Sequence, residues 1–411
     1  MLDFIRIACA VPPVRVGDVR KNVEDICLYM ERADCAGADI VVFPELSLTG
    51  YTCGDLFFQD TLLQAAKEGL RKIALFGAAF PKLTAVVGLP LQIGTKLYNC
   101  AAVIARGEVV GIVPKTHIPN YNEFSEKRWF ASGAELKDTW LEPGDVGMVA
   151  SEDYWTVPVS SKQLFCVGGE AVVGVEICED LMAPHPVCAE LAARGAEVIL
   201  NLSASDAAAG KAAYRRELVK HQSGACCCVY AYVSAGCTES TADMVFSGHG
   251  IIAEDGKLLA ESKNGPQGEY MLISDCDLGR IRADRRKSQY FSAVEDAAAA
   301  GFVVRSTYTD ALRGDGSHYP VKKLPFVPED PIACAERCRE VFELQVVGLR
   351  RRLELLNAKP VLGISGGLDS TLALLVSVEA VKQMGKPATE TVCLTMPCFG
   401  TSDRTYHNAL S

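Results

Sequence analysis

Short apolar runs alternate with amphipathic stretches over roughly the first 275 residues, a pattern that predicts strands alternating with helices. Residues 4–11 read FIRIACAV and residues 38–46 read ADIVVFPEL, so apolar side chains occupy both odd and even positions. A strand that is apolar on both faces belongs to a sheet that is covered on both faces. The pattern therefore predicts an α/β fold with buried sheets.

Further elements of the same kinds follow along this part of the chain. Helices are predicted where apolar residues recur at helical spacing, over 19–36, 60–75 and 187–195, with Gly195 as the cap of the third. Strands are predicted over the remaining apolar runs, at residues 84–91, 98–105, 108–114, 170–178, 196–205, 228–236, 249–256 and 269–278.

The amino-acid composition changes after residue 277. Residues 278–330 are rich in charge and proline, which favours a linker over a packed element. A second α/β unit is then predicted, with a long amphipathic helix, a strand, a helix and a further strand. The sequence thus divides into a first domain at 1–277, a linker at 278–330 and a second domain at 331–411.

Charge and composition narrow the class of protein. Of the 411 residues, 49% are hydrophobic and 22% charged, as in a globular protein, and the net charge is −10. That charge argues against a protein that coats nucleic acid or an acidic membrane. No apolar run reaches the ~18 residues that span a bilayer, and the first residues, with Asp3, do not resemble a signal peptide. A cytoplasmic location is expected.

The 17 cysteines do not form a pattern of metal ligands. No CxxC pair occurs, and Cys334 and Cys338, at helical spacing, have no second pair of zinc ligands nearby. No metal site is predicted in the first domain. Most cysteines are interpreted as small core residues of a reducing compartment.

One cysteine raises a chemical question. Cys178 closes the predicted strand 170–178 in the stretch VGVEICED, between Glu176 and the pair Glu179–Asp180. Neighbouring carboxylates raise the pKa of a thiol and suppress the reactive thiolate. A catalytic Cys178 would therefore need a base and a cation from elsewhere in the chain.

Two other strand ends supply those groups. Glu45 follows the run VVFP, and a buried carboxylate with a raised pKa is a competent general base. Lys115 follows GIVP and could stabilise an oxyanion. Taken singly, each has an ordinary alternative: a helix cap or core acid for Glu45, a solvated loop residue for Lys115 and a structural thiol for Cys178.

The flanks of these residues resemble the nitrilase superfamily of carbon–nitrogen hydrolases. FPELSLTGY, PKTHIPNYNEF and GVEICED match its three motifs, and the likeness spans residues 4 to 277. The resemblance implies an α-β-β-α sandwich that cleaves amides. It makes Cys178 the nucleophile, Glu45 the proton acceptor and Lys115 the group that stabilises the tetrahedral intermediate.

The second domain carries a glycine-rich motif between a strand and a helix. VLGISGGLDSTLAL lacks the ending of a Walker loop but resembles the SGGxDS pyrophosphate loop of the ATP pyrophosphatases, whose domain is Rossmann-like. The resemblance implies ATP with Mg²⁺ in this domain. The ATP-binding residues would be Ser365, Gly366, Gly367, Asp369 and Ser370.

The pairing of an amidase with an SGGxDS unit resembles the family of glutamine-dependent NAD⁺ synthetases. In that family glutamine releases ammonia, which amidates ATP-activated deamido-NAD⁺ (nicotinic acid adenine dinucleotide) in the other domain. The resemblance implies a homo-oligomer, and glutamine-binding residues that match at GYT, NYNEF, CED and NLSASDAAAGK: Tyr51, Tyr121, Glu179, Ser205 and Lys211.

Two departures from that family affect the expectations. Cys398 stands where the family usually has glycine, and the strands predicted after residue 331 have no partners that complete a sheet. We therefore expect an incomplete synthetase domain in a chain that hydrolyses glutamine but does not make NAD⁺ alone. The alternatives are a free-standing amidase or carbamoylase, which has no use for SGGLDS, and a non-catalytic assembly module, which needs no Glu45, Lys115 and Cys178.

Overall fold

The computed structural model of the chain describes residues 3–137, 139–148, 156–263, 268–291, 301–399 and 402–410. The chain forms two compact units, Met1–Pro320 and Val321–Ser411, and each is described by itself.

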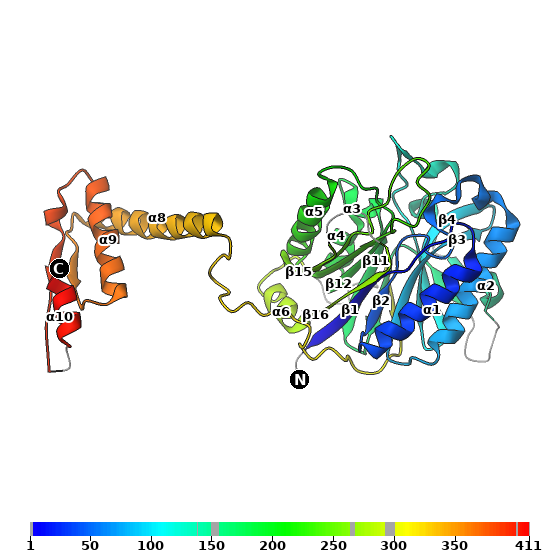
Figure 1. Ribbon diagram of the computed structural model, residues 1–411, viewed down its shortest axis with the longest axis horizontal. Coiled ribbons are helices and arrows are strands. Elements are labelled where there is room, and N and C mark those ends of the chain that lie inside the picture. Colours follow the sequence, from blue (N-terminus) through cyan, green and yellow to red (C-terminus); the bar gives the residue numbers. More distant parts are fainter. Residues whose placement is uncertain are drawn as a thin grey trace. The chain divides into compact units, whose positions relative to one another are not determined.

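An eight-stranded sheet forms one half of the first unit (Figure 1). Its core is three parallel strands, in which Ile7 of one strand pairs with Ile40 of the next and Ile40 with Thr84 of the third. In the order β16-β1-β2-β3-β4-β5-β9-β8, the strands are β16 (Tyr270–Asp277), β1 (Phe4–Val11), β2 (Ile40–Val42), β3 (Thr84–Ile93), β4 (Lys96–Ala105), β5 (Glu108–Pro114), β9 (Val157–Val159) and β8 (Thr139–Leu141).

A seven-stranded sheet packs face to face against the first. Its centre is again parallel, with Val173 opposite Val198 and Val198 opposite Val229. In the order β15-β14-β13-β12-β11-β10-β17, the strands are β15 (Lys257–Glu261), β14 (Gly250–Glu254), β13 (Val229–Ser234), β12 (Val198–Ser203), β11 (Ala171–Ile177), β10 (Gln163–Val167) and β17 (Val303–Ser306).

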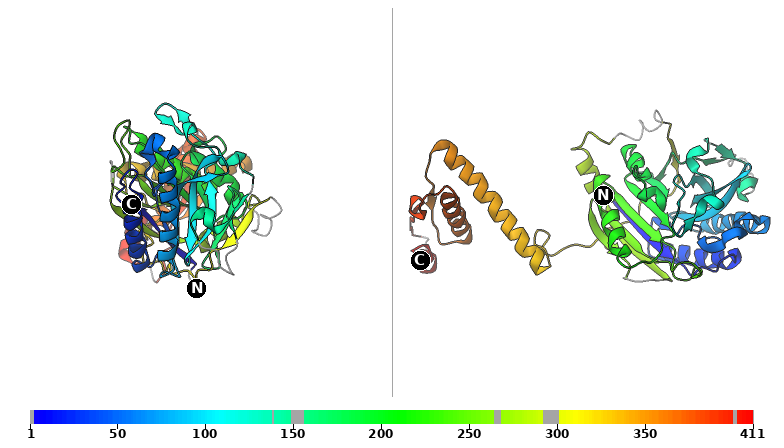
Figure 2. Two further views of the ribbon diagram at one scale, coloured as in Figure 1. Left: turned by 90° about the vertical axis from the view of Figure 1, so that its right-hand side faces the viewer. Right: turned by 90° about the horizontal axis from the view of Figure 1, so that it is seen from above.

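Helices cover the outer face of each sheet, so that the unit has four layers. Helices α1 (Val19–Cys35) and α2 (Asp60–Gly77) lie side by side over the first sheet (Figures 1 and 2). Three helices lie on the side of the second: α3 (Glu179–Met182), α4 (Val187–Ala193) and α5 (Lys211–Ala225). The α-β-β-α sandwich expected from the sequence is confirmed.

Alternation along β1 shows why the strands are apolar on both faces. Ile5, Ile7 and Cys9 pack between the two sheets, whereas Ala8 and Ala10 pack beneath the helices. Successive side chains of a strand point to opposite faces, so a strand in the middle of four layers needs an apolar residue at nearly every position.

The first unit extends beyond the 1–277 division expected from the sequence. Helix α6 (Leu278–Arg285) follows β16, and β17 joins the second sheet beside β10. The buried guanidinium of Arg6 then pairs with Asp275 at 2.7 Å and with Asp315 at 2.6 Å. A charged residue of the segment that favoured a linker, Asp315, thus pairs with the sandwich.

Shorter elements connect the strands and helices of the first unit. They are the 3₁₀ segments η1 (Tyr51–Phe58), η2 (Glu126–Arg128), η3 (Gly133–Glu135) and η4 (Pro143–Val146) and the hairpin of β6 (Asn120–Tyr121) and β7 (Phe124–Ser125). None of the helices in the described parts of the chain is long and apolar enough to cross a membrane.

The second unit is much smaller. Its elements are α8 (Pro331–Leu356), β18 (Val361–Gly363), α9 (Leu368–Gln383), η6 (Ala388–Glu390), β19 (Val392–Leu394) and α10 (Asp403–Leu410). Strands β18 and β19 form a parallel pair, and the buried core cluster consists of Val346, Val376 and Ala380. Three buried residues remove far less apolar surface from water than the clusters of the first unit.

The small core predicts a difference in resistance to protease. Brief digestion of the whole chain should cut the second unit first, because local opening is easiest where few apolar side chains are buried. The cleavage sites can be read by mass spectrometry of the fragments. We expect a resistant fragment that ends near Pro320, whereas equal survival of residues 331–399 would contradict the expectation.

Candidate active site

Three strand ends bring the predicted catalytic residues to one place. Glu45 follows β2 by three residues, Lys115 follows β5 directly and Cys178 follows β11 directly. Two backbone hydrogen bonds join the first and last of these turns to β12: the Glu45 N–H donates to Ser203 O at 3.3 Å, and the Cys178 N–H donates to Leu202 O at 2.9 Å. The carboxyl ends of strands from both sheets therefore meet at this site.

Lys115 lies between two carboxylates in the protein interior. Its Nζ is 2.6 Å from Glu45 Oε1 and 2.7 Å from Glu126 Oε1, and all three side chains are at most 2% exposed. Asn99 Nδ2 donates to Glu45 Oε1 at 2.6 Å. This set, Glu45, Asn99, Lys115 and Glu126, is called the charged cluster below. A buried ammonium is stable only with such counter-charges.

The electrostatics of the charged cluster suit proton transfer. Burial would lower the pKa of Lys115, but the charges of Glu126 and Glu45 outweigh it and hold the pKa well above its ordinary value. Burial raises the pKa of Glu45 to about 7, against the opposing effect of Lys115. Lys115 is thus a fixed cation, and Glu45 changes its protonation near neutral pH.

One oxygen of Glu45 is left for chemistry. Oε1 accepts from both Lys115 and Asn99, whereas Oε2 is buried and has no hydrogen-bond partner among the described residues. An unpartnered buried carboxylate oxygen is costly unless a protic group uses it. A thiol or a substrate amide is such a group.

Cys178 sits in a strained turn between β11 and α3. Its backbone has φ 49° and ψ −98°, a conformation that costs an L-residue about 1–3 kcal/mol. The side chain is buried at 8% exposed. Burial, and then the charge of Glu45, raise the pKa of the thiol, while Lys115 acts in the opposite direction. The resting thiol is therefore protonated and needs a base.

The acids near Cys178 in the sequence form hydrogen bonds with groups other than the thiol. Glu176 lies on the opposite face of the strand, where it accepts from the Cys188 N–H at 2.7 Å and from Asn201 Nδ2 at 3.1 Å. Burial raises its pKa to about 7. No local pattern indicates these partners, because they come from α4 and β12.

Asp180 ties the two catalytic turns together. Its carboxylate accepts from the backbone N–H of Ile177 at 3.1 Å, of Thr116 at 3.1 Å and of His117 at 2.7 Å. Burial raises its pKa to about 6. The turn that carries Cys178 is thereby held against the residues that follow Lys115.

Glu126 is a site residue that the sequence analysis missed. It lies on η2, eleven positions after Lys115 and two beyond the motif PKTHIPNYNEF, and accepts from the Tyr51 hydroxyl at 2.8 Å. Its neighbours, Ser125 and Lys127, are polar, so no apolar pattern predicts that Glu126 is buried. The one available signal was an acid two residues beyond a motif that contains predicted site residues.

The five predicted glutamine-binding residues form two groups. Tyr51 reaches the charged cluster through Glu126, and the Tyr121 hydroxyl donates to Glu179 at 2.9 Å. Burial raises the pKa of both tyrosines, and the acids that they contact act in the same direction. Tyr51 thus contacts the charged cluster, and Tyr121 contacts the acid that follows Cys178 in the chain.

The second group lies between β12 and α5. Ser205 is buried and its Oγ accepts from Arg215 Nη1 at 2.9 Å. Lys211, the first residue of α5, pairs with Asp206 and lies 5.6 Å from the centre of the Phe124 ring. Phe124 in turn packs against Tyr121, with ring centroids 6.0 Å apart. The aromatic pair links the two groups.

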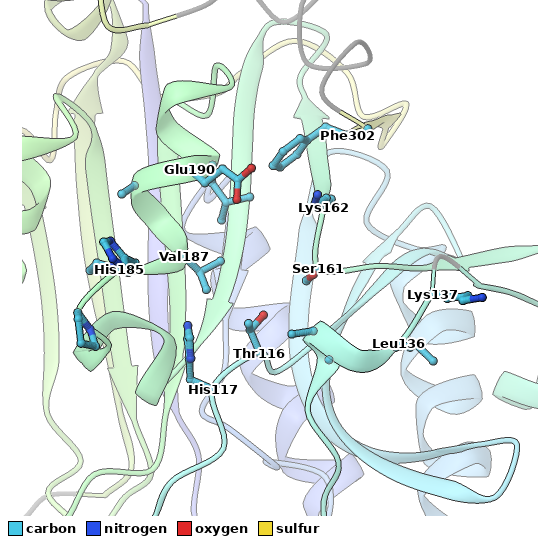
Figure 3. Close-up of a pocket in the computed structure, with 17 residues that line it drawn as sticks. Thr116, His117, Leu136, Lys137, Ser161, Lys162, His185, Val187, Glu190 and Phe302 are labelled. Carbon is cyan, nitrogen blue, oxygen red and sulfur yellow. The ribbon is translucent and has the colours of Figure 1, made fainter.

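A cavity of about 990 Å³ borders this region from the side of α4 (Figure 3). In the view of Figure 3, Thr116 and His117 lie in the lower part of the cavity and Glu190 and Phe302 in the upper part. Glu45, Lys115 and Cys178 are not among its lining residues, so this cavity is distinct from the charged cluster.

The glycine-rich loop of the second unit connects β18 to α9. Ser365 Oγ is 3.1 Å from Ser370 Oγ, and the latter donates to Gly367 O at 3.0 Å. Gly366 has φ +78°, and a side chain there would collide with the backbone carbonyl of Thr405 in α10. Both observations require glycine at this position.

The fold and the charged cluster define an enzyme of the carbon–nitrogen hydrolase class, and the chain belongs to that family. Residues 6–286 match the carbon-nitrogen hydrolase family. An amidase from Nesterenkonia sp. has the same fold, with a TM-score of 0.51 at 22% identity over 69% of this chain and 94% of its own.

Relatives that extend over both units have a more specific name. The chain is 36% identical over 418 residues to the glutamine-dependent NAD(+) synthetase of Mycobacterium leprae, over 99% of this chain and 59% of that protein. A crystal structure of a glutamine-dependent NAD(+) synthetase from Cytophaga hutchinsonii has a TM-score of 0.57 at 23% identity, over 99% of this chain and 63% of its own. The chain thus spans about three fifths of the length of these relatives.

Removal of the buried cation should destabilise the first unit. Lys115→Met leaves Glu45 and Glu126 facing each other without compensation, and breaking a buried ion pair in this way costs about 3–5 kcal/mol. Urea denaturation at about pH 8 measures the change in the free energy of unfolding.

The matched control is Lys96→Met, which breaks an exposed pair with Glu135. Exposed pairs contribute about 0–1 kcal/mol. Equal effects of the two substitutions would show that the charged cluster carries no special stability.

Proposed function

We propose that the chain hydrolyses glutamine to glutamate and ammonia through a thioester on Cys178. The observation that carries the proposal is the buried contact of Lys115 with Glu45, at the strand ends where the Cys178 turn is anchored. The names of the relatives, which are called glutamine-dependent, support glutamine as the amide.

The reaction follows from the arrangement of the charges. Glu45 Oε2 takes the thiol proton while Sγ attacks the amide carbon, and Lys115 stabilises the oxyanion that forms. Glu45 then gives the proton to the departing nitrogen, which leaves as ammonia. A water molecule, activated by the same carboxylate, hydrolyses the thioester and restores the thiol.

The polar residues around the thiol suit the two ends of an amino acid. Glu179, with Tyr121, is proposed to bind the α-amino group, because a carboxylate is the complementary charge. Ser205 and Lys211 are proposed to bind the α-carboxylate. Tyr51 is proposed to form the wall next to Glu126.

The second unit is proposed to bind ATP. Hydroxyls of Ser365 and Ser370 and the amides of Gly366 and Gly367 lie at the start of α9, where backbone N–H groups favour phosphate. Asp369 supplies a carboxylate oxygen of the kind that Mg²⁺ prefers. ATP would activate the carboxylate of deamido-NAD⁺ so that ammonia can displace AMP.

We therefore propose that the chain contributes the glutaminase activity to a cytoplasmic, homo-oligomeric glutamine-dependent NAD⁺ synthetase and does not make NAD⁺ alone. The relatives that match both units support this proposal over a free-standing amidase, for which the second unit has no role. Glutamine, ATP and deamido-NAD⁺ are the proposed substrates.

The direct test is ammonia release from glutamine. The wild-type chain should release ammonia, and Cys178→Ala should lose activity by a factor of at least about 10³, because the nucleophile is removed. A glutamate-dehydrogenase-coupled assay measures the product. Cys53→Ala, at another buried cysteine that no step uses, is the control and should stay active. Ammonia release by Cys178→Ala at the wild-type rate would sink the proposal.

The pH dependence tests the role of Glu45. A general base must be ionised, so kcat/KM should rise with pH through about 7, the pKa to which burial raises Glu45. This rise, the acid limb of the pH profile, reflects the charged cluster as a whole, because the protonation of Glu45 depends on the charges of its neighbours.

The matched variant is Glu176→Gln. Burial also raises the pKa of Glu176 to about 7, but Glu176 lies on the other face of β11. This variant should keep the limb at about the same pH. Loss of the acid limb in Glu176→Gln would show that Glu176, and not Glu45, is responsible for the pH dependence.

A further inference from the structure

Arg215 is a buried cation outside the charged cluster. It lies on α5, is 2% exposed and uses Nη1 to donate to Ser205 Oγ and to Asp206 O, each at 2.9 Å. Its Nε donates to His249 Nδ1 at 3.3 Å. Among the described residues no carboxylate forms an ion pair with it. A buried guanidinium without a counter-charge is expensive, which indicates a use beyond packing.

The direction of these hydrogen bonds determines how Ser205 can act. A guanidinium only donates, so Ser205 Oγ must be the acceptor and its hydroxyl hydrogen is left to donate elsewhere. The Ser205 backbone is fixed as well, because its N–H donates to Ser234 Oγ at 2.9 Å. Arg215 therefore holds Ser205 as a pre-oriented donor at the end of β12.

His249 holds Arg215 only in its neutral form. Nδ1 must carry a lone pair to accept from Arg215, so the ring hydrogen is on Nε2, which bonds Glu261 Oε1 at 2.8 Å. Glu261 is also bound by Arg216 Nε at 2.8 Å. Arg215 and Arg216 on α5 and Glu261 on β15 are the charged groups that face the imidazole from the described elements.

The neutral form dominates at neutral pH. Burial lowers the pKa of His249 below its ordinary value of 6.5, although the bond to Glu261 acts in the opposite direction. Acid therefore adds a proton to Nδ1, which then points a hydrogen at the Nε–H of Arg215 and places two cations side by side.

We propose that Arg215 is a positioning residue that holds Ser205 for the carboxylate of the amino-acid substrate, and that protonation of His249 releases this hold and weakens substrate binding in acid. The inference rests on the proposed glutaminase function, and it adds a determinant of carboxylate recognition that takes no part in the chemistry of the amide. It predicts an effect on affinity that is separate from the Glu45 limb in kcat/KM.

The test measures glutamine affinity without turnover, in the full chain carrying Cys178→Ala. Isothermal titration calorimetry between about pH 5 and pH 8 gives the Kd at each pH. With His249 present, the Kd should rise about tenfold towards the acid end, the effect of leaving one buried donor unpaired. Added His249→Gln supplies an amide oxygen that accepts from Arg215 but does not titrate, so most of this rise should vanish.

A second pair of variants tests Arg215 itself. Arg215→Lys keeps the charge but cannot reach Ser205, Asp206 and His249 together, so the Kd at about pH 8 should rise about tenfold. Lys220→Gln, on the same helix in an exposed pair with Glu217, is the control and should leave the Kd unchanged. Circular dichroism establishes that each variant is folded, and His249→Gln keeps the test valid if Arg215→Lys does not fold.

The outcomes separate the two proposals. Parallel curves of Kd against pH with and without His249→Gln overturn the inference while leaving the glutaminase intact. If wild-type chain releases no ammonia from glutamine and the Cys178→Ala chain binds none at any pH, the proposed function fails, and the role of Arg215 fails with it.

Discussion

The site depends on one buried ammonium group. Lys115 cannot be removed from water without negative partners, and Glu45 and Glu126 supply them at 2.6 and 2.7 Å. The two acids come from segments 81 residues apart in sequence, yet both must meet the same Nζ. This requirement fixes the turn after β2, the turn after β5 and the start of η2 with respect to one another. The relative positions of these residues thus follow from the need to compensate the buried charge of Lys115.

The same cluster explains how a thiol among carboxylates can be a nucleophile. Burial and the charge of Glu45 keep the Cys178 thiol protonated at rest, so the thiol becomes reactive only when a base takes its proton. Glu45 has one oxygen engaged by Lys115 and Asn99 and the other unpartnered. Meanwhile Glu176 and Asp180 are engaged with α4 and with the backbone after Lys115. The neighbouring acids therefore brace the turn, and the distant acid, Glu45, is the one that we propose as the base.

Arg215 is a second buried cation, and it differs from Lys115 in the kind of partner that surrounds it. Lys115 is compensated by carboxylates of the protein, whereas the partners of Arg215 among the described residues are a hydroxyl, a carbonyl and an imidazole. Because no described carboxylate pairs with Arg215, its charge adds to the positive potential around Ser205. In the proposed pocket, Glu179 is assigned to the amino group of the substrate and Ser205, held by Arg215, to the carboxylate.

Much of this could be predicted from the sequence because the signal is local. The apolar runs predict most strands of both sheets, and Glu45, Lys115 and Cys178 stand at strand ends where a motif can be recognised. Other features gave no local signal. Helix α5 is polar along much of its length, β8, β9 and β17 have three or four residues each, and Glu126 and Arg215 lie in polar stretches.

The sequence by itself determined the class of fold and the three groups of the proposed chemistry, since alternation of apolar residues and the residue types at strand ends are properties of the chain. Only the tertiary structure decided which acids face the lysine, which acids brace the turn and which arginine has no carboxylate partner among the described residues. Those outcomes depend on contacts between elements distant in sequence, and burial changes the free energy of a charge according to its partners in space rather than its neighbours along the chain.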